Sequence, residues 1–377
     1  MSELSYLEKL LDGVEVEWVT LGSMADIGTG NSNRQDESEN GIYPFYVRSK
    51  NILKSDTFEF DEVAIVIPGE GGIGDIFHYV EGKYALHQRA YRIRITTNAV
   101  DTKFLYYFMS SSFKQYILTK SVGATAISIR KPMLEGFKVP IPSPDNPEKS
   151  LAIQSEIVRI LDTFTALTAE LTAELSMRKK QYYYYRNQLL SFDEGEVEWK
   201  TLGEVATFRR GTAITQKQTT PGDIPVVANG PTPTYFHSES NRQDETIVIA
   251  RSGAYAGYVS FWNQPIFLTD AFSVHPNLKI VKPKFLYYVL QNKQEHIHAM
   301  KKGAGVPHVR VKEFESYDVP IPPLAEQVRI VTILDKFDTL TNSIAEGLPR
   351  EIELRQKQYE YYRDMLFSFP KPEVAEA

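Results

Sequence analysis

The strongest constraint on the fold is an internal duplication with a period of about 180 residues. Val16-Glu-Trp-Val-Thr-Leu-Gly22 returns as Val197-Glu-Trp-Lys-Thr-Leu-Gly203 at an offset of 181. Phe104-Leu-Tyr-Tyr107 returns as Phe285-Leu-Tyr-Tyr288 at the same offset. A period of this length is too long for a solenoid and indicates two homologous halves.

The register of the repeat changes in the later part of each half. Ile160-Leu-Asp162 pairs with Ile333-Leu-Asp335 at an offset of 173, and Lys180-Gln-Tyr182 pairs with Lys357-Gln-Tyr359 at an offset of 177. The second copy therefore has four more residues between these two motifs.

Each half consists of a globular part followed by a helical part. The globular parts contain short apolar runs, such as Val63–Ile67 and Thr246–Ala250, which predict strands bounded by turns. Lys103–Leu118 and Lys284–Met300 each predict a single helix. The expected divisions are an N-terminal helical segment (1–13), a first globular domain (14–148), a central helical spacer (149–194), a second globular domain (195–322), a C-terminal helical spacer (323–369) and a tail (370–377).

The helical parts carry a narrow apolar stripe at spacings of three and four, which is typical of a coiled-coil seam. Gly347-Leu-Pro349 interrupts the second stripe and predicts a kink or a restart. The tyrosines at 182–185 and 359–362 could stack on nucleic-acid bases, but packing on the seam is favoured. The seam positions are Leu161, Phe164, Leu171, Tyr182, Tyr185, Leu334, Phe337, Leu340, Tyr359 and Tyr362.

The fold class that follows is α+β. Two homologous mixed α/β domains are expected, separated by two long antiparallel coiled-coil helical regions. The N-terminal Leu10–Trp18 resembles Leu189–Trp199, where the first half passes into the second. The sequence therefore predicts a pseudo-twofold, circular arrangement.

The central spacer contains a tandem repeat of Thr-Ala-Glu-Leu, at Thr168–Leu171 and Thr172–Leu175. Four residues are close to one helical turn, so each copy lengthens a helix without rotating its face far. This pattern indicates a spacer whose length matters.

Composition excludes several classes of protein. The chain has no cysteine, which rules out disulfides and thiolate zinc sites and favours the cytoplasm. The N-terminus has no signal-peptide pattern, and no apolar run approaches the ~18 residues of a membrane span. The net charge of −6 argues mildly against nucleic-acid binding, although local patches can differ from the total.

Catalytic motifs are weak or missing. Gly69–Gly74 matches G-x-G-x-x-G after a strand, but Asp75–Val80 indicates a second strand where a dinucleotide site needs a helix. No phosphate-binding loop, no His-Glu-x-x-His and no adenine-methyltransferase tetrapeptide is present. His296 and His298 lack further ligands at metal-binding spacing, and a helix-surface role is favoured for both.

Basic runs at equivalent places in both halves indicate nucleic-acid binding. Residues 83–94 and 300–312 each contain four basic residues and no acid, and Arg130 aligns with Arg310. Such loops can place cations on phosphates and Arg, Asn, Gln or His on base edges; the alternative is a solvated edge strand. The candidate DNA-binding residues are Arg34, Arg48, Lys50, His87, Gln88, Arg89, Lys120, Arg130, Lys131, Arg209, Arg210, Asn229, Arg251, Tyr255, Lys301, Lys302, His308 and Arg310.

Three longer motifs resemble a known family. Residues 319–327 (Val-Pro-Ile-Pro-Pro-Leu-Ala-Glu-Gln), 333–341 and 346–363 resemble the conserved regions of type I restriction–modification specificity subunits, HsdS. The Thr-Ala-Glu-Leu repeat and the opening Tyr6–Gly13 resemble the type IC subgroup.

The resemblance implies that each globular domain is a target recognition domain for one half of a bipartite, asymmetric site in double-stranded DNA. The helices would set the gap between the half-sites and dock two HsdM methyltransferase subunits. S-adenosylmethionine would be bound by HsdM, and ATP and Mg by HsdR restriction subunits. This chain would hold no cofactor and no metal, would have no catalytic residues, and would not associate with a membrane.

Two alternatives come from other classes. A self-sufficient methyltransferase or nuclease is disfavoured by the missing motifs. A coiled-coil scaffold without sequence-specific DNA binding explains the helices, but leaves two locally basic globular domains without a role.

Overall fold

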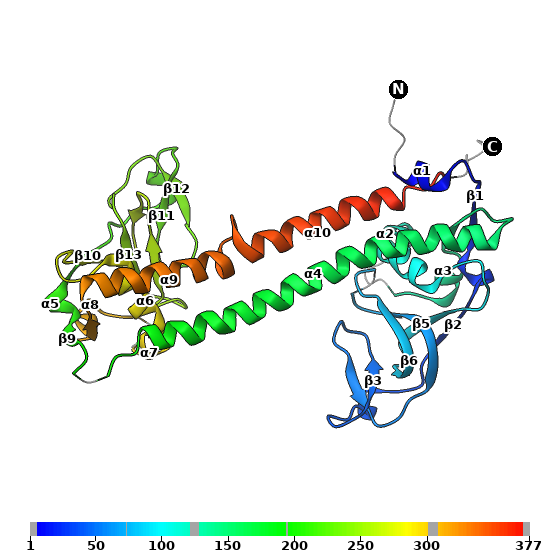
Figure 1. The fold of residues 1–377 in the computed structure, drawn as a ribbon, viewed down its shortest axis with the longest axis horizontal. Coiled ribbons are helices and arrows are strands. Elements are labelled where there is room, and N and C mark those ends of the chain that lie inside the picture. The colour runs from blue at the N-terminus through cyan, green and yellow to red at the C-terminus, as the bar shows by residue number, and fades with distance from the viewer. Residues whose placement is uncertain (1–5, 73, 121–127, 194, 301–307, 372–377) are drawn as a thin grey trace. The chain divides into compact units, whose positions relative to one another are not determined.

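The computed structural model describes residues 6–72, 74–120, 128–193, 195–300 and 308–371 (Figure 1). It divides into two compact units. Unit 1 comprises Met1–Glu170 with Ile352–Ala377, and unit 2 comprises Leu171–Glu351. Each unit therefore contains one globular domain together with parts of the helical spacers, and the long helix α4 (Pro147–Leu189) contributes to both.

Unit 1 holds the first globular domain. Its elements are α1 (Tyr6–Leu11), β1 (Val16–Thr20), η1 (Leu21–Ser23), β2 (Ala25–Thr29), η2 (Arg34–Asp36), β3 (Tyr43–Tyr46), β4 (Leu53–Ser55), β5 (Phe60–Pro68), β6 (His78–Leu86), β7 (Ala90–Ile95), α2 (Thr102–Lys120), α3 (Lys131–Glu135) and β8 (Lys138–Pro142). The strands form a six-stranded sheet in the order β2-β7-β5-β6-β3-β4, and β1 pairs with β8 at the base of the domain.

Unit 2 repeats this plan with a divided sheet. Its elements are β9 (Glu198–Thr201), α5 (Leu202–Val205), β10 (Ala206–Arg210), η3 (Gln216–Gln218), β11 (Ile224–Val227), β12 (Tyr235–His237), β13 (Thr246–Ala250), β14 (Val259–Trp262), β15 (Phe267–Leu268), β16 (Ala271–Pro276), α6 (Pro283–Asn292), α7 (Gln294–Ala299), α8 (Val311–Glu315), β17 (Asp318–Ile321), α9 (Leu324–Asn342) and the start of α10 (Gly347–Leu366). The sheets have the orders β10-β16-β13-β14, β12-β11-β15 and β17-β9.

The division of the second sheet follows from a break in one strand. In unit 1, β6 is nine residues long and pairs with both β5 and β3. In unit 2 its place is taken by two short strands, β14 and β15, with Pro265 between them. Proline has no backbone N–H and interrupts a strand that must pair on both sides.

The predicted strands at Val63–Ile67 and Thr246–Ala250 are confirmed as β5 and β13. The strand β6, and not a helix, follows the glycine-rich turn after β5, as expected. The prediction of a single helix over Lys284–Met300 is wrong, because α6 and α7 are separated at Lys293, whose ψ is 18°. The break accompanies the Gln294 side chain, which accepts a hydrogen bond from Val259 N and donates one to Gly257 O at the edge of β14.

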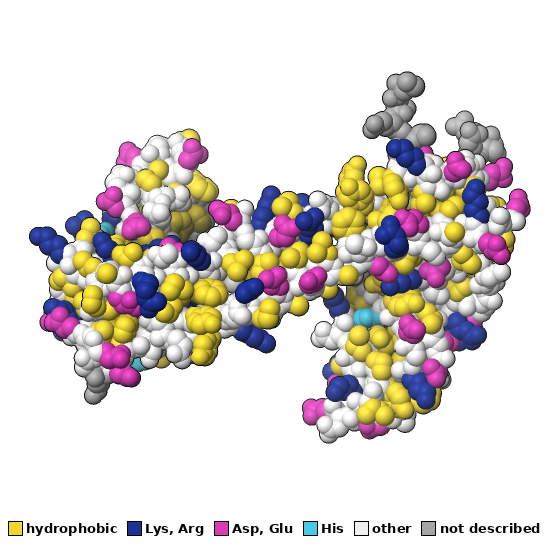
Figure 2. Space-filling model, in the orientation of Figure 1, with side chains coloured by type: hydrophobic (Ala, Val, Ile, Leu, Met, Phe, Trp, Pro, Cys, Tyr) yellow, Lys and Arg dark blue, Asp and Glu magenta, His cyan; other side chains and the backbone are white. Residues whose placement is uncertain are grey.

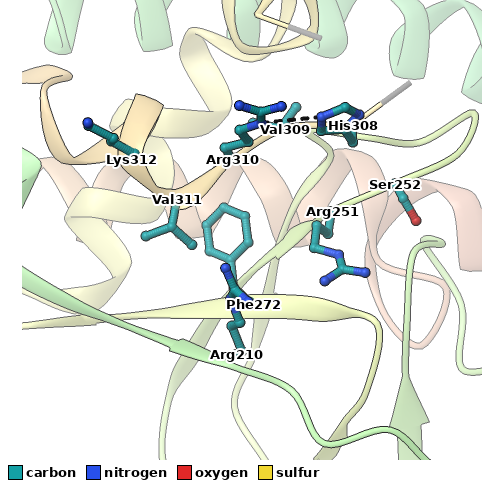
Figure 3. A pocket seen from close by; sticks show the side chains of 9 residues that line it. All are labelled: Arg210, Arg251, Ser252, Phe272, His308, Val309, Arg310, Val311 and Lys312. Carbon is teal, nitrogen blue, oxygen red and sulfur yellow. Dashed lines mark hydrogen bonds between the residues drawn. The ribbon is translucent and has the colours of Figure 1, made fainter. Parts of the chain in front are cut away.

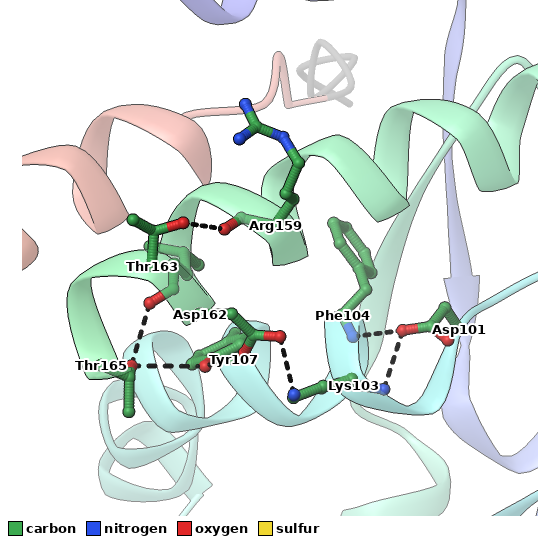
Figure 4. A network of polar contacts seen from close by, with 9 residues as sticks. Asp101, Lys103, Phe104, Tyr107, Arg159, Asp162, Thr163 and Thr165 are labelled. Atoms are coloured by element: carbon green, nitrogen blue, oxygen red, sulfur yellow. Dashed lines mark hydrogen bonds and ion pairs between the residues drawn. The ribbon is translucent and has the colours of Figure 1, made fainter. Parts of the chain in front are cut away.

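A polar network joins each globular domain to its spacer helix. In unit 1 the Tyr107 hydroxyl of α2 donates to Asp162 of α4 over 2.6 Å, and Lys103 Nζ lies 2.7 Å from the same carboxylate (Figure 4). In unit 2 Tyr288 of α6 donates to Asp335 of α9, and Lys284 Nζ lies 3.1 Å from it. The domains therefore share one mode of attachment.

Aromatic contacts join the spacer helices within each unit. In unit 1 Phe164 of α4 stacks on Tyr362 of α10, with ring centroids 5.3 Å apart. In unit 2 Phe337 of α9 stacks on Tyr185 of α4 at 5.7 Å and also contacts Tyr182. Leu161 and Leu334 are fully buried. The interruption predicted at Gly347 is confirmed, because α9 ends at Asn342 and α10 begins at Gly347, where φ is +76°.

The C-terminal segment completes the core of unit 1. Phe367 and Phe369 pack edge-on against Phe104 of α2. Trp18 Nε1 donates to Pro370 O over 2.8 Å, which ties this segment to β1. Residues 6–20 and 364–370 therefore meet in unit 1, as the predicted circular arrangement requires.

Candidate nucleic-acid interface

Both globular domains place a polar cluster at the same strand ends. In the first domain, Gly69 follows β5, and its carbonyl oxygen accepts from Ile129 N over 2.8 Å. In the second domain, Arg251 follows β13, and its carbonyl oxygen accepts from Val309 N over 2.9 Å. The segment before each short helix, α3 or α8, thus pairs with the end of a central strand. Backbone pairing makes Gly69 equivalent to Arg251.

Strand register extends the comparison to the side chains. Tyr46 pairs with Leu86 as Val227 pairs with Leu268, and Pro68 pairs with Ala90 as Ala250 pairs with Ala271. Three equivalences follow: Arg48 with Asn229, Glu70 with Ser252, and Arg89 with Asp270. The loop before β7 has one more residue than the loop before β16. The two clusters therefore occupy the same site with different chemistry.

In the first domain the cluster has two cations around one carboxylate. Glu70 Oε2 lies 3.0 Å from Arg48 Nη1 and 3.2 Å from Arg89 Nη1, and all three side chains are about half exposed. Burial, together with the charges of Arg48 and Arg89, lowers the pKa of His87. Arg48 and Glu70 line a cavity of about 350 Å³, and Arg34 and His87 line it too. The cluster has donors in excess of acceptors, which suits the phosphates and base edges of DNA.

In the second domain Arg251 and Ser252, which follow β13, line a cavity of about 480 Å³ together with the segment that precedes α8 (Figure 3). Arg310 Nε donates to His308 Nε2 over 3.3 Å on the segment that precedes α8. Among the described residues that line it there is no carboxylate, and the four cationic side chains are Arg210, Arg251, Arg310 and Lys312.

A carboxylate lies just outside this cavity. Asp270 Oδ1 is 2.9 Å from Arg251 Nη2, while Asp270 Oδ2 accepts from Asn229 Nδ2 and from Ser252 Oγ. Asn229 Oδ1 accepts from the backbone N–H groups of Arg251 and Ser252. The amide of Asn229 is thus used on both its donor and its acceptor side.

The candidate DNA-binding residues divide by position. Those gathered in the two clusters are Arg34, Arg48, His87, Arg89, Arg210, Asn229, Arg251, His308 and Arg310. Gln88 lies beside the first cluster and donates to Asn33 Oδ1. Lys120 lines a different hollow, beside Phe369 and Lys371.

The remaining candidates lie elsewhere in the domains or outside the described residues. Lys131 is near Glu135, with 3.8 Å between charged atoms, and the Tyr255 ring packs edge-on to Tyr258. Lys50, Arg130 and Arg209 line neither of the two cavities described above. Lys301 and Lys302 lie outside the described residues.

Sequence reasoning missed the partners of the arginines. Glu70, Ser252 and Asp270 were not among the predicted DNA-binding residues, which are positively charged, amide, histidine or tyrosine side chains. The repeat contained a usable signal, since Asp270 occupies the position of Arg89. Lys312 was also missed, although it belongs to the basic run that ends there.

The described histidines and carboxylates bear on whether the domains could hold a metal ion. Within the described residues no group of three or more His, Asp or Glu is placed to hold a metal ion. His298 contacts Ala256 O through Nδ1, and His296 lies beside the Tyr317 ring. None of the described helices is long and apolar enough to cross a membrane.

The spacer helices expose a repeated pair of tyrosines. Tyr184 and Tyr185 of α4 pack edge-on with centroids 5.3 Å apart, and Tyr361 and Tyr362 of α10 do so at 5.4 Å. Between 38% and 66% of each side chain is exposed. Figure 2 shows hydrophobic side chains reaching the surface along the helical segments, between charged ones. Each unit therefore carries the same exposed aromatic feature.

Comparisons with known proteins agree with this duplicated architecture. The family model "Type I restriction modification DNA specificity domain" matches residues 13–177 and again 194–354. The chain is 40% identical to the EcoR124I/EcoR124II type I restriction enzyme specificity subunit of Escherichia coli, over 99% of both chains. It is 35% identical to the EcoprrI specificity subunit of Escherichia coli, over 92% of this chain and 93% of the relative.

A solved structure has the same fold. The type I restriction–modification S subunit of M. genitalium superposes with a TM-score of 0.68 at 21% identity, over 96% of this chain and 98% of that one. The fold, the duplicated family match and the identity over nearly the whole length lead to one conclusion: the chain belongs to the family of type I restriction–modification DNA specificity subunits.

Proposed function

We propose that this chain confers DNA sequence specificity on a type I restriction–modification complex. Each globular domain contacts one half of a bipartite, asymmetric site in double-stranded DNA. The observation that carries the proposal is the pair of clusters at equivalent strand ends, Arg48–Glu70–Arg89 in one domain and Asn229–Ser252–Asp270 with Arg251 in the other. Recognition of two different half-sites requires equivalent positions in the two domains to carry different side chains.

Physical chemistry supports DNA as the ligand. Arginine presents N–H groups in a fork that fits O6 and N7 of guanine, while other cations neutralise phosphates. The described lining of the second cavity has four cations and no carboxylate, in a chain whose net charge is −6. A local excess of positive charge in an acidic protein favours a polyanionic ligand at that place.

The helices supply the second part of the proposal. Two HsdM methyltransferase subunits dock on them, one beside Tyr184 and Tyr185 and the other beside Tyr361 and Tyr362. Partly exposed tyrosines are frequent at protein interfaces, and an equivalent pair in each unit suits one kind of partner that binds twice. HsdM binds S-adenosylmethionine and methylates adenine, and HsdR subunits with ATP and Mg add restriction. This chain is the non-catalytic subunit.

The test is a genome-wide adenine-methylation map. The full chain is expressed with its HsdM partner in a bacterium that lacks adenine methylation. We expect methylation at one bipartite motif with a fixed gap. Assembly of a stable complex that leaves no sequence motif would contradict the proposal and favour a scaffold without DNA specificity.

A further inference from the structure

The backbone and the carboxylate around Arg251 fix the direction of its side chain. Its N–H donates to Asn229 Oδ1 over 3.0 Å, and its carbonyl oxygen accepts from Val309 N over 2.9 Å. Its Nη2 lies 2.9 Å from Asp270 Oδ1. The backbone and the guanidinium of Arg251 are therefore both held in place. A long side chain that is already ordered loses less conformational entropy when it binds a ligand.

The Nη2 group of Arg251 is paired with Asp270, and the other N–H groups of the guanidinium are available to a ligand. The side chain is about half exposed, and within the described part of the chain its other N–H groups have no protein acceptor. Arg251 lines the cavity in which Arg210, Arg310 and Lys312 supply the remaining charge (Figure 3). Its donors thus open toward a hollow that favours an anionic or acceptor-rich ligand.

The neighbouring polar groups are already committed. Asp270 forms an ion pair with Arg251 and accepts hydrogen bonds from Asn229 and Ser252, and the amide of Asn229 is used on both its donor and its acceptor side. Their contacts hold the backbone and the guanidinium of Arg251 in place. They are positioning residues, and the arginine is the group with unused donors.

From this geometry we infer that Arg251, oriented by Asp270, recognises a guanine in the half-site that the second domain contacts. The inference rests on the proposed function and assigns one base contact within it. Guanine is the base that offers two acceptors, O6 and N7, in the major groove at the spacing of the guanidinium fork. In the first domain Gly69 stands at this position, so the contact belongs to one half-site only.

The experiment compares methylation maps of the full complex with the parent chain and four variants. Arg251→Ala removes the contact. Arg251→Lys keeps the charge and loses the fork, and Asp270→Asn weakens the orientation of the arginine. Lys279→Ala is the control, because it removes one exposed charge from the same domain outside the cavity.

We expect the parent motif to contain a G·C pair in one half-site that becomes degenerate in both Arg251 variants. The loss of discrimination should be roughly tenfold to a hundredfold, as for one bidentate contact, and smaller for Asp270→Asn. The other half-site and the gap should stay unchanged, which a general loss of folding would not produce. Lys279→Ala should keep the parent motif.

Several results would overturn the inference while leaving the proposed function intact. A parent motif with no G·C pair in the affected half-site is one. An unchanged motif in Arg251→Lys is another, and this variant decides the matter if Arg251→Ala fails to assemble. If the parent complex itself leaves no bipartite motif, the proposed function fails first, so the two failures are distinguishable.

Discussion

The Tyr107 hydroxyl donates to Asp162 over 2.6 Å and so joins the helix α2 of the first globular domain to the spacer helix α4. The burial of Tyr107 and its hydrogen bond to Asp162 raise the pKa of the phenol, which therefore stays protonated and donates at all physiological pH values. Tyr288 and Asp335 make the same bond in unit 2. This bond is present in both halves and marks the place where each globular domain meets a spacer helix.

Tyr107→Phe should destabilise unit 1 by about 1–2 kcal/mol, because it removes a hydrogen bond to a charged acceptor while Lys103 keeps the carboxylate paired. Hydrogen exchange of peptides from α2 and from residues 150–170 measures the loss locally. Tyr183→Phe, at an exposed tyrosine of α4, is the control and should change little. Equal protection in Tyr107→Phe and the parent would show that the bond contributes nothing.

The duplication and the strands that follow short apolar runs could be predicted from the sequence, because these are local patterns. The restart at Gly347 could also be predicted, since glycine and proline act on their own backbone. The break between α6 and α7 could not, because it accompanies bonds from Gln294 to Gly257 and Val259, 37 and 35 positions away.

The candidate site shows the same limit. Arg48, Arg89 and Arg251 were identified from charge and from position in the repeat, and both can be read from the sequence. Their carboxylate partners, Glu70 and Asp270, depend on which strands lie side by side, and Arg48 and Glu70 are 22 positions apart. Pairing over such separations is fixed by strand register, which single-sequence patterns do not specify.

The exposed tyrosine pairs predict the stoichiometry of the complex. Tyr184→Ala and Tyr361→Ala should each weaken one of two HsdM binding events, by about 1–2 kcal/mol for an aromatic contact at an interface. Native mass spectrometry over a range of HsdM concentrations measures the two events. Met177→Ala removes another exposed apolar side chain from α4 and is the control. Two undiminished binding events in both variants would place HsdM elsewhere.

The C-terminal segment should be required for the stability of unit 1. Phe369 is almost fully buried against Phe104, so Phe369→Ala should cost about 3 kcal/mol through lost burial and the cavity that remains. Ile344→Ala, at a residue that is 83% exposed, should stay within about 0.5 kcal/mol of the parent. Urea unfolding followed by hydrogen exchange in α2 compares them, and similar values for the two variants would contradict this role.

His275 predicts a loss of stability in the second domain at acid pH. Burial and the charges of Arg209 and Arg242 lower the pKa of His275 to about 4, from an ordinary value near 6.5. The unfolded chain therefore binds more protons between these values, so stability is full above about pH 6.5 and falls as the pH drops toward 4.

His275→Asn cannot take up this proton and should show a smaller fall in stability between pH 7 and pH 5. Hydrogen exchange of β16 peptides at both values measures the effect in the second domain, away from His78 and His87, whose pKa values are also lowered, by burial first. His296→Asn, at an exposed histidine of α7, serves as the control. An equal loss in His275→Asn and the parent would remove this residue as the cause.

The Thr-Ala-Glu-Leu repeat predicts how the gap between the half-sites is set. Both copies lie within the continuous helix α4, after the contact of Phe164 with Tyr362 and before the contact of Tyr182 with Phe337. An extra copy therefore lengthens the helix between the two seams and leaves each seam intact. In the C-terminal spacer, residues 343–346 between α9 and α10 are not helical. This connection can change its conformation when α4 becomes longer.

A variant with three copies adds about 6 Å of helix, against about 3.4 Å of rise for each base pair. The methylated motif should keep both half-sites and gain a gap longer by about one or two pairs. Replacing one copy by Ala-Ala-Glu-Leu, which preserves the length, should leave the gap unchanged. If the three-copy variant methylates the parent motif with the parent gap, the length of α4 does not set the spacing.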